Sequence, residues 1–241
     1  MSPLTPIDNI PGKSIDARLA AVHARIAAAE QRYDRTPGSV TLVAVSKHQP
    51  AAAILAAYRA GQPHFGESYL QEALAKQTAL MNHPVIWHFI GAVQSNKTRE
   101  IAQHFAWVHS LDRLKIAERL NEQRPPELPP LDICIHVNIG AEQQKTGVAP
   151  AQLPTLLQQV HKLSRLRVRG LMALPPLSGN FAEQRGYFHQ LRVAFERLKA
   201  QGYPLDTLSM GMSADLEAAI AEGATLVRVG TALFGERPRK P

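Results

Sequence analysis

The sequence contains a single cysteine, Cys134, few aromatic residues (6%), and no uninterrupted apolar run of the roughly 18 residues that a membrane helix needs. One cysteine excludes an internal disulfide, and its place in an apolar stretch indicates packing rather than nucleophilic chemistry. The missing apolar run excludes a membrane-spanning helix. With 45% hydrophobic and 20% charged residues, the composition is that of an ordinary globular protein.

The first residues, MSPLTPIDNIPGKS, lack the apolar core of a signal peptide, so we expect no export and a cytoplasmic location. A chain of 241 residues has the length of one large α/β barrel, and we expect a single domain over residues 1–241. Within it we expect residues 1–13 to be flexible and residues 238–241 to form a basic tail.

The net charge of +7 and the sequence pI of about 9.8 indicate anionic partners, without saying which. The densest basic stretch holds Lys162, Arg165, Arg167 and Arg169. Aromatic residues do not alternate with these charges, and no nucleic-acid motif accompanies them. We therefore interpret the stretch as a solvated surface and expect no nucleic-acid or membrane partner.

Short apolar, β-branched runs alternate with helical patterns along the chain. The runs are TLVAVS at 41–46, HFG at 64–66, VIWHFI at 85–90, AWVHSL at 106–111, LDICIHVNI at 131–139, RVRGLM at 167–172, TLSMG at 207–211 and TLVRVG at 225–230. An additional helix, capped by Ser14, precedes them. Strand and helix alternating eight times predict a single (β/α)8 TIM-type barrel with an extra N-terminal helix.

Lys47 directly follows the first of these runs, so it lies where a barrel strand ends and a loop of the catalytic face begins. Burial near apolar walls favours the neutral amine, which can attack an aldehyde. A lysine that extends from a strand end into solvent is the alternative.

The segment from Ser209 to Thr231 predicts a phosphate site. Ser209, Gly211 and Ser213 form a turn of small residues before a helix, and Gly230 and Thr231 form a second turn after the last strand. In barrels, the loops after the last two strands frequently hold a phosphate. The alternative is structural, with Ser213 as a helix cap and Gly230 in a tight turn.

Other polar residues are harder to assign from their positions. Asp215 and Glu217 would repel an anion at the first of these turns unless they point away. Arg228 lies within an apolar strand and needs a partner, either an acidic side chain or a ligand atom. Strand-associated histidines, at 64, 88 and 136, lack metal-site spacing, so we predict no metal.

Six ordered blocks of this sequence belong together: LVAVSK ending at Lys47, HFGESYLQE at 64–72, WHFIGAVQSNK at 87–97, HVNIGAEQQKTG at 136–147, LSMGMSADLEAAI at 208–220 and VRVGTALFGER at 227–237. This set resembles the YggS/PROSC family of pyridoxal phosphate homeostasis proteins. The resemblance runs from about residue 15 to 237. Ser68 stands where the family usually has asparagine.

The resemblance implies the fold of the alanine racemase N-terminal barrel and the cofactor pyridoxal 5'-phosphate (PLP), held as a Schiff base on Lys47. It also implies that Arg228 faces the pyridine nitrogen and that five residues line the phosphate: Ser209, Gly211, Ser213, Gly230 and Thr231. The function implied is PLP homeostasis, as a carrier or regulator of free PLP that affects amino-acid and keto-acid balance.

An arginine at the pyridine nitrogen weakens PLP as an electron sink, so we expect a non-catalytic binder. Too little chain follows the last strand for the second domain of alanine racemase, which supports a non-catalytic role. We also expect a monomer, with PLP-dependent apo-enzymes as recipients of PLP. Three alternatives stay open: a small PLP-dependent racemase-type enzyme, a cofactor-free Schiff-base aldolase using Lys47, and a nucleic-acid binder.

Overall fold

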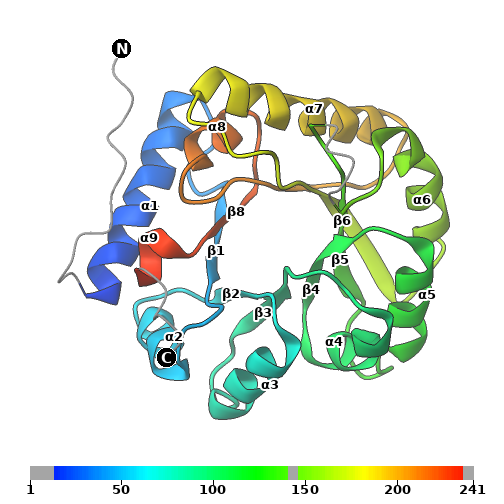
Figure 1. The fold of residues 1–241 in the computed structure, drawn as a ribbon, viewed down its shortest axis with the longest axis horizontal. Helices are drawn as coiled ribbons and strands as arrows, with labels where there is room; N and C mark the ends of the chain where they lie inside the picture. Colours follow the sequence, from blue (N-terminus) through cyan, green and yellow to red (C-terminus); the bar gives the residue numbers. More distant parts are fainter. Residues whose placement is uncertain (1–13, 141–145, 236–241) are drawn as a thin grey trace.

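Eight parallel strands close into a barrel in the computed structural model, which describes residues 14–140 and 146–235 (Figure 1). Each strand pairs with the next along the chain, and the last pairs with the first. The strands are β1 (Thr41–Val45), β2 (His64–Glu67), β3 (Ile86–Phe89), β4 (Trp107–Leu111), β5 (Leu131–His136), β6 (Leu166–Met172), β7 (Thr207–Ser209) and β8 (Leu226–Val229).

Helices cover the outside of this barrel (Figure 1). They are α1 (Ile15–Arg32), α2 (Ala51–Arg59), α3 (Leu70–Ala79), α4 (Thr98–His104), α5 (Leu114–Gln123), α6 (Leu153–Val160), α7 (Phe181–Ala200), α8 (Leu216–Ala221) and α9 (Thr231–Phe234), with single 3₁₀ turns η1 (Ser95–Lys97) and η2 (Pro150–Gln152). The predicted barrel with its extra N-terminal helix is thereby confirmed.

Local sequence explains where several helices end. Gly61, Gly202 and Gly223 follow α2, α7 and α8 with φ between 91° and 95°, the left-handed conformation that glycine adopts without strain. Ser14 occupies the N-cap position of α1, but its side chain makes no capping hydrogen bond to that helix. The expectation of a side-chain cap at Ser14 was therefore wrong.

Closure of the barrel brings the two ends of the described chain together. β1 pairs with β8 in a register that places Val43 opposite Arg228. The extra helix α1 lies outside this seam and packs against α8 and α9 (Figure 1). Residues far apart in sequence therefore meet at the seam between the first and last strands.

Some expectations fall outside this description. Residues 1–13 and the basic tail at 238–241 are among the positions that the structure does not describe. Within residues 14–140 and 146–235, no helix combines the length and the apolar character needed to cross a membrane.

Candidate functional site

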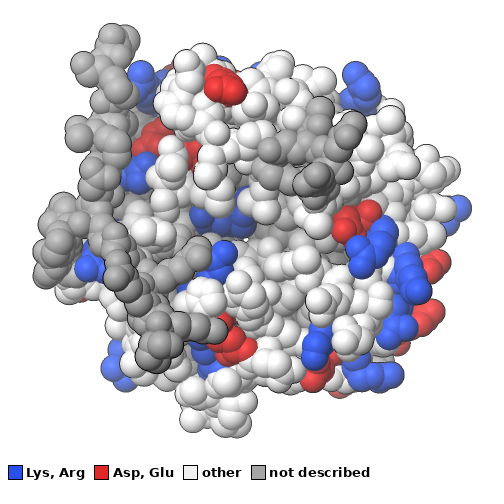
Figure 2. Space-filling view, in the orientation of Figure 1, with Lys and Arg blue, Asp and Glu red and all other residues white. Residues whose placement is uncertain are grey.

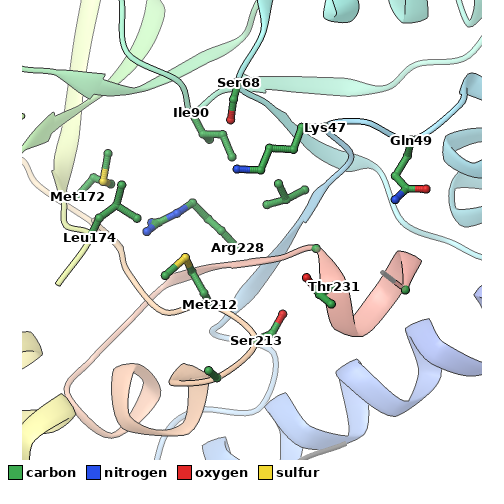
Figure 3. Close-up of a pocket in the computed structure, with 14 residues that line it drawn as sticks. Lys47, Gln49, Ser68, Ile90, Met172, Leu174, Met212, Ser213, Arg228 and Thr231 are labelled. Carbon is green, nitrogen blue, oxygen red and sulfur yellow. The ribbon is translucent and has the colours of Figure 1, made fainter. Parts of the chain in front are cut away.

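A pocket of about 270 Å³ lies at the carboxyl end of the barrel, where the strands give way to their following loops. Its volume is near the lower end of the range for small-molecule sites. The lining combines apolar side chains with a lysine, an arginine, a glutamine and three hydroxyl groups (Figure 3). The lining residues are Val45, Lys47, Gln49, Ser68, Ile90, Met172, Leu174, Met212, Ser213, Ala214, Arg228, Gly230, Thr231 and Gly235.

The pocket brings together five of the seven predicted site residues, namely Lys47, Ser213, Arg228, Gly230 and Thr231. Lys47 and Arg228 lie on two sides of its open centre, and the hydroxyl groups of Ser213 and Thr231 lie together on a third side (Figure 3). Ser209 and Gly211, the other two, are not among the lining residues.

Buried charges hold the backbone on either side of Lys47. The ammonium group of Lys76 donates to the carbonyl oxygen of Ser46 at 2.7 Å and to the carboxylates of Glu67 at 2.7 Å and Glu72 at 2.6 Å. The hydroxyl of Ser46 donates to Glu67 at 2.6 Å. This network fixes the end of β1, and with it the direction in which the Lys47 side chain leaves the strand.

Residue 48 continues this anchored turn. His48 has a left-handed φ of 65°, which is uncommon for a residue other than glycine, and its backbone N–H donates to the carboxylate of Glu72. Burial raises the pKa of the Glu67 carboxyl, against the opposing effect of Lys76, and one carboxylate oxygen of Glu67 has no hydrogen-bond partner. The support of Lys47 therefore contains a buried polar group that is only partly satisfied.

Arg228 is held in the barrel interior by neutral groups. Its guanidinium donates to the hydroxyl of Ser209 at 2.6 Å and to the carbonyl oxygen of Ala173 at 2.9 Å. Burial lowers the pKa of Arg228 to about 10, while the nearby Asp215 carboxylate opposes this decrease. Among the described residues, no carboxylate accepts a hydrogen bond from Arg228, so its charge stays available to the pocket.

The loop after β7 is fixed from behind by the extra helix. Arg25 of α1 donates to the carbonyl oxygen of Ser213 at 3.1 Å and makes a two-pronged ion pair with Glu217 at 2.8 and 2.9 Å. Asp215 accepts the backbone N–H of Met212 at 2.6 Å. Both acidic side chains are therefore engaged within the protein, which removes the objection that they would repel an anion.

Gly211 allows the backbone turn that precedes α8. Its φ is 94°, and an added Cβ would lie 2.6 Å from the Cβ of Ala219 in α8. Only glycine fits this turn against the helix. Ser213 is not the cap of α8 either, since Asp215 occupies the N-cap position.

The second small-residue turn lies at the barrel seam. Gly230 caps the short helix α9, and an added Cβ would approach the carbonyl oxygen of Val45 to 3.2 Å. Glycine thus allows the chain leaving β8 to pass close to β1. Since the first N–H groups of a helix have no partner within it, Thr231 offers both a hydroxyl and a backbone donor at the pocket.

Positive charge collects at the hollow in the middle of this face (Figure 2). The lysine and arginine that line the pocket are Lys47 and Arg228, and no acidic residue appears in its described lining. Such a site favours an anionic ligand. Among the described residues, no group of three or more histidine, cysteine or acidic side chains could hold a metal ion.

The sequence analysis missed three residues around this site: Arg25, Lys76 and His109. Arg25 and Lys76 act from helices, and neither belongs to a motif that marks it. His109 donates to or accepts from Ser209 at 2.7 Å in the barrel interior. The signal for His109 was available, because β3 and β4 each carry a histidine at their third position.

These features define a class: a (β/α)8 barrel with a lysine at the end of its first strand and a phosphate-type turn after its last. The family described as alanine racemase, N-terminal domain, matches residues 17–238. Alanine racemase from Corynebacterium glutamicum has a similar structure, with a TM-score of 0.65 at 16% identity over 91% of this chain and 61% of that one. That likeness shows the fold alone.

Two more similar proteins narrow the class. The pyridoxal phosphate homeostasis protein of Pseudomonas aeruginosa is 57% identical, over 93% of this chain and 96% of that protein. The structure of PipY from Synechococcus elongatus with PLP bound has a TM-score of 0.82 and 42% identity, over 92% of this chain and all of that one. The chain belongs to the pyridoxal phosphate homeostasis protein family.

Proposed function

We propose that this chain binds PLP in the pocket at the carboxyl end of the barrel and serves PLP homeostasis as a carrier or regulator. The observation that carries the proposal is the meeting of Lys47, Arg228, Ser213 and Thr231 in one pocket. PLP offers an aldehyde to an amine, a pyridine nitrogen to a donor and a phosphate to hydroxyl and N–H groups. The donor set therefore fits this cofactor.

Lys47 holds the cofactor as a Schiff base in this proposal. Lys47 would supply the amine that forms a C=N bond with the aldehyde carbon, with loss of water. The turn at Ser213 and the turn at Gly230 and Thr231 receive the phosphate, with charge-assisted hydrogen bonds worth roughly 1.5–3 kcal/mol each. Ser209 and Gly211 act behind these groups, the first on Arg228 and the second on the turn.

Arg228 supports a binding role over a catalytic one. When PLP is bound, its ring can act as an electron sink if the pyridine nitrogen is protonated. A guanidinium facing that nitrogen disfavours the protonation. In addition, the described lining of the pocket includes no tyrosine that could exchange a proton with a substrate. We therefore propose that the chain does not turn over amino acids.

The proposal also covers the recipients of PLP, the cellular location and the oligomeric state. We propose PLP-dependent apo-enzymes as recipients, and the single cysteine, Cys134, buried as a free thiol, supports the reducing cytoplasm. We propose a monomer. Analytical ultracentrifugation of the loaded protein tests the monomeric state, and PLP transfer to a purified apo-aminotransferase tests whether apo-enzymes receive PLP.

The central experiment is borohydride reduction of the PLP-loaded protein followed by peptide mapping. The pyridoxyl group should lie on Lys47. Lys47→Ala should abolish the reducible attachment and leave weaker, phosphate-dependent binding, whereas the control Lys97→Ala should label as the wild type does. A label on another lysine of the wild type contradicts the assignment, and turnover of amino acids that Lys47→Ala abolishes contradicts the non-catalytic role.

A further inference from the structure

A continuous hydrogen-bonded chain runs through the barrel interior from Arg228 to the start of β2. Arg228 donates to the hydroxyl of Ser209 at 2.6 Å, and that hydroxyl meets Nδ1 of His109 at 2.7 Å. Nε2 of His109 meets Nδ1 of His88 at 2.9 Å, and Nε2 of His88 meets Nδ1 of His64 at 3.0 Å. Four strands and the pocket arginine are thereby connected through side chains alone.

The inner members of this chain are isolated from water. Ser209, His88 and His109 are completely buried, while His64 is partly exposed at the first residue of β2. Burial holds the pKa of His109 at about 3 and keeps the pKa of His88 well below its usual range. Both rings are therefore neutral near pH 7, and a neutral imidazole has one donor nitrogen and one acceptor nitrogen.

Arg228 gives the chain a direction. A guanidinium can only donate, so the oxygen of Ser209 accepts from it, and the hydroxyl proton is left to donate to Nδ1 of His109. The proton of His109 must then lie on Nε2 and point to His88. The same reasoning places the proton of His88 on Nε2, pointing to Nδ1 of His64.

The opposite direction is less favourable. It would place a second donor, Nδ1–H of His109, on the Ser209 oxygen that already accepts from Arg228. The hydroxyl proton of Ser209 would then lose its acceptor in a fully buried position, which costs about 1–3 kcal/mol. The arrangement in which all three histidines carry Nε2–H is the one that satisfies every group in the chain.

The surroundings contain no acidic side chain that could reverse this direction by a direct contact among the described residues. Among the described residues, the imidazole rings of His64, His88 and His109 make hydrogen bonds only to one another and to Ser209. Trp107 stacks on His88 with centroids 5.5 Å apart, and the guanidinium of Arg169 lies over the Trp107 ring, 5.0 Å from its centroid. At the pocket end, Arg228 adds positive charge near His109, and Asp215 lies near Arg228.

We propose that Ser209, His109, His88 and His64 are positioning residues for the cofactor pocket: a hydrogen-bonded chain of fixed direction that orients Arg228 and polarises it. Their effect on PLP rests on the proposed function, but their effect on Arg228 does not. The guanidinium donates to the Ser209 hydroxyl and to the Ala173 carbonyl oxygen. Because the Ser209 hydroxyl is also bonded to His109, the protonation and tautomer of the histidines determine how strongly that hydroxyl holds Arg228.

The first test uses the protein without ligand. Nitrogen NMR of histidine- and arginine-labelled protein at pH 7 should show Nε2–H, with unprotonated Nδ1, for His88 and His109. His88→Leu interrupts the chain without touching Arg228, and it should shift the guanidinium resonances of Arg228. Phe105→Leu is the control and should leave those resonances unchanged, because Phe105 is a buried residue at the end of α4 that packs on Phe89.

The second test adds PLP to the same variants. His88→Leu and Ser209→Ala should weaken PLP binding roughly two- to tenfold, the effect of weakening one hydrogen bond, and should shift the visible absorption band. Phe105→Leu should bind as the wild type does. Ser209→Thr, which keeps the hydroxyl, should restore most of the wild-type band.

Each outcome of these experiments tests one part of the proposal. Nδ1–H or doubly protonated rings in the ligand-free protein contradict the direction of the chain. Arg228 resonances that respond equally to His88→Leu and Phe105→Leu contradict the positioning role. A wild-type protein that fails to take up PLP defeats the proposed function instead, and the ligand-free spectra still decide the proposal made here.

Discussion

Acidification should destabilise this protein through its buried histidines, and His109 gives the clearest case. Its pKa is about 3 in the folded protein and about 6.5 in the unfolded chain. Because the folded-state pKa is lowered, the unfolded chain binds more protons below pH 6.5. Stability is therefore complete above pH 6.5 and is lost as the pH falls toward 3.

The magnitude follows from these two pKa values. At His109 the unfolded chain binds about a quarter of a proton at pH 7 and nearly a whole proton at pH 5, while the folded protein binds almost none at either pH. Integrating that difference gives a loss of about 2 kcal/mol in the free energy of unfolding. His88, which is also completely buried with a lowered pKa, adds a loss in the same direction.

Urea unfolding at pH 7, 6 and 5 measures this loss when the wild type is compared with His109→Gln. The variant cannot take up the proton, so its free-energy difference from the wild type should shrink by about 2 kcal/mol from pH 7 to pH 5. His161→Gln, an exposed position on the outer surface, is the control. A difference that stays constant with pH would show that His109 takes up its proton equally in the folded and unfolded states, and it would refute the buried neutral chain.

Three further results are expected from the contacts around the pocket. Gly211→Ala should lower the free energy of unfolding by about 1–3 kcal/mol or more, because φ is 94° and the added Cβ meets α8. Gly38→Ala, with a φ of 76° and open space around it, is the control and should cost less. Thermal unfolding of the two variants measures the difference. Lys76→Met should cost about 3–5 kcal/mol in urea unfolding by leaving Glu67 buried and unpaired, and adding Glu67→Gln should recover part of that loss. Arg25→Ala should weaken PLP binding roughly three- to tenfold, because it releases the turn at the pocket, and the loss should be larger at low salt than at high salt. Isothermal titration calorimetry measures the affinity. An affinity equal to that of the wild type would mean that the turn keeps its shape without its contact to α1.

Most of the fold was readable from the sequence because barrel strands and their covering helices have different periodicities. The run before Lys47 and the glycines that end α2, α7 and α8 are local signals, and each is produced by a few neighbouring residues. Placing Lys47 at a strand end required nothing more than that pattern. The chemistry of PLP came instead from the resemblance.

Contacts across the barrel could not be read in this way. Arg25 meets Ser213 across 188 positions, and His109 meets Ser209 across 100. No periodicity links such pairs, because the geometry of closure brings them together. For the same reason, the sequence grouped Ser209 with the phosphate turn, while the structure places its hydroxyl between a buried histidine and Arg228.

The seam between β1 and β8 also sets when the pocket can first exist during synthesis. Lys47 leaves the ribosome 181 residues before Arg228, which at about 5–20 residues per second is a delay of roughly ten to forty seconds. Until β8 pairs with β1, the lysine has neither the arginine nor the second turn beside it. A nascent chain therefore carries the lysine without the groups that select its ligand, and selective binding begins only once the barrel has closed.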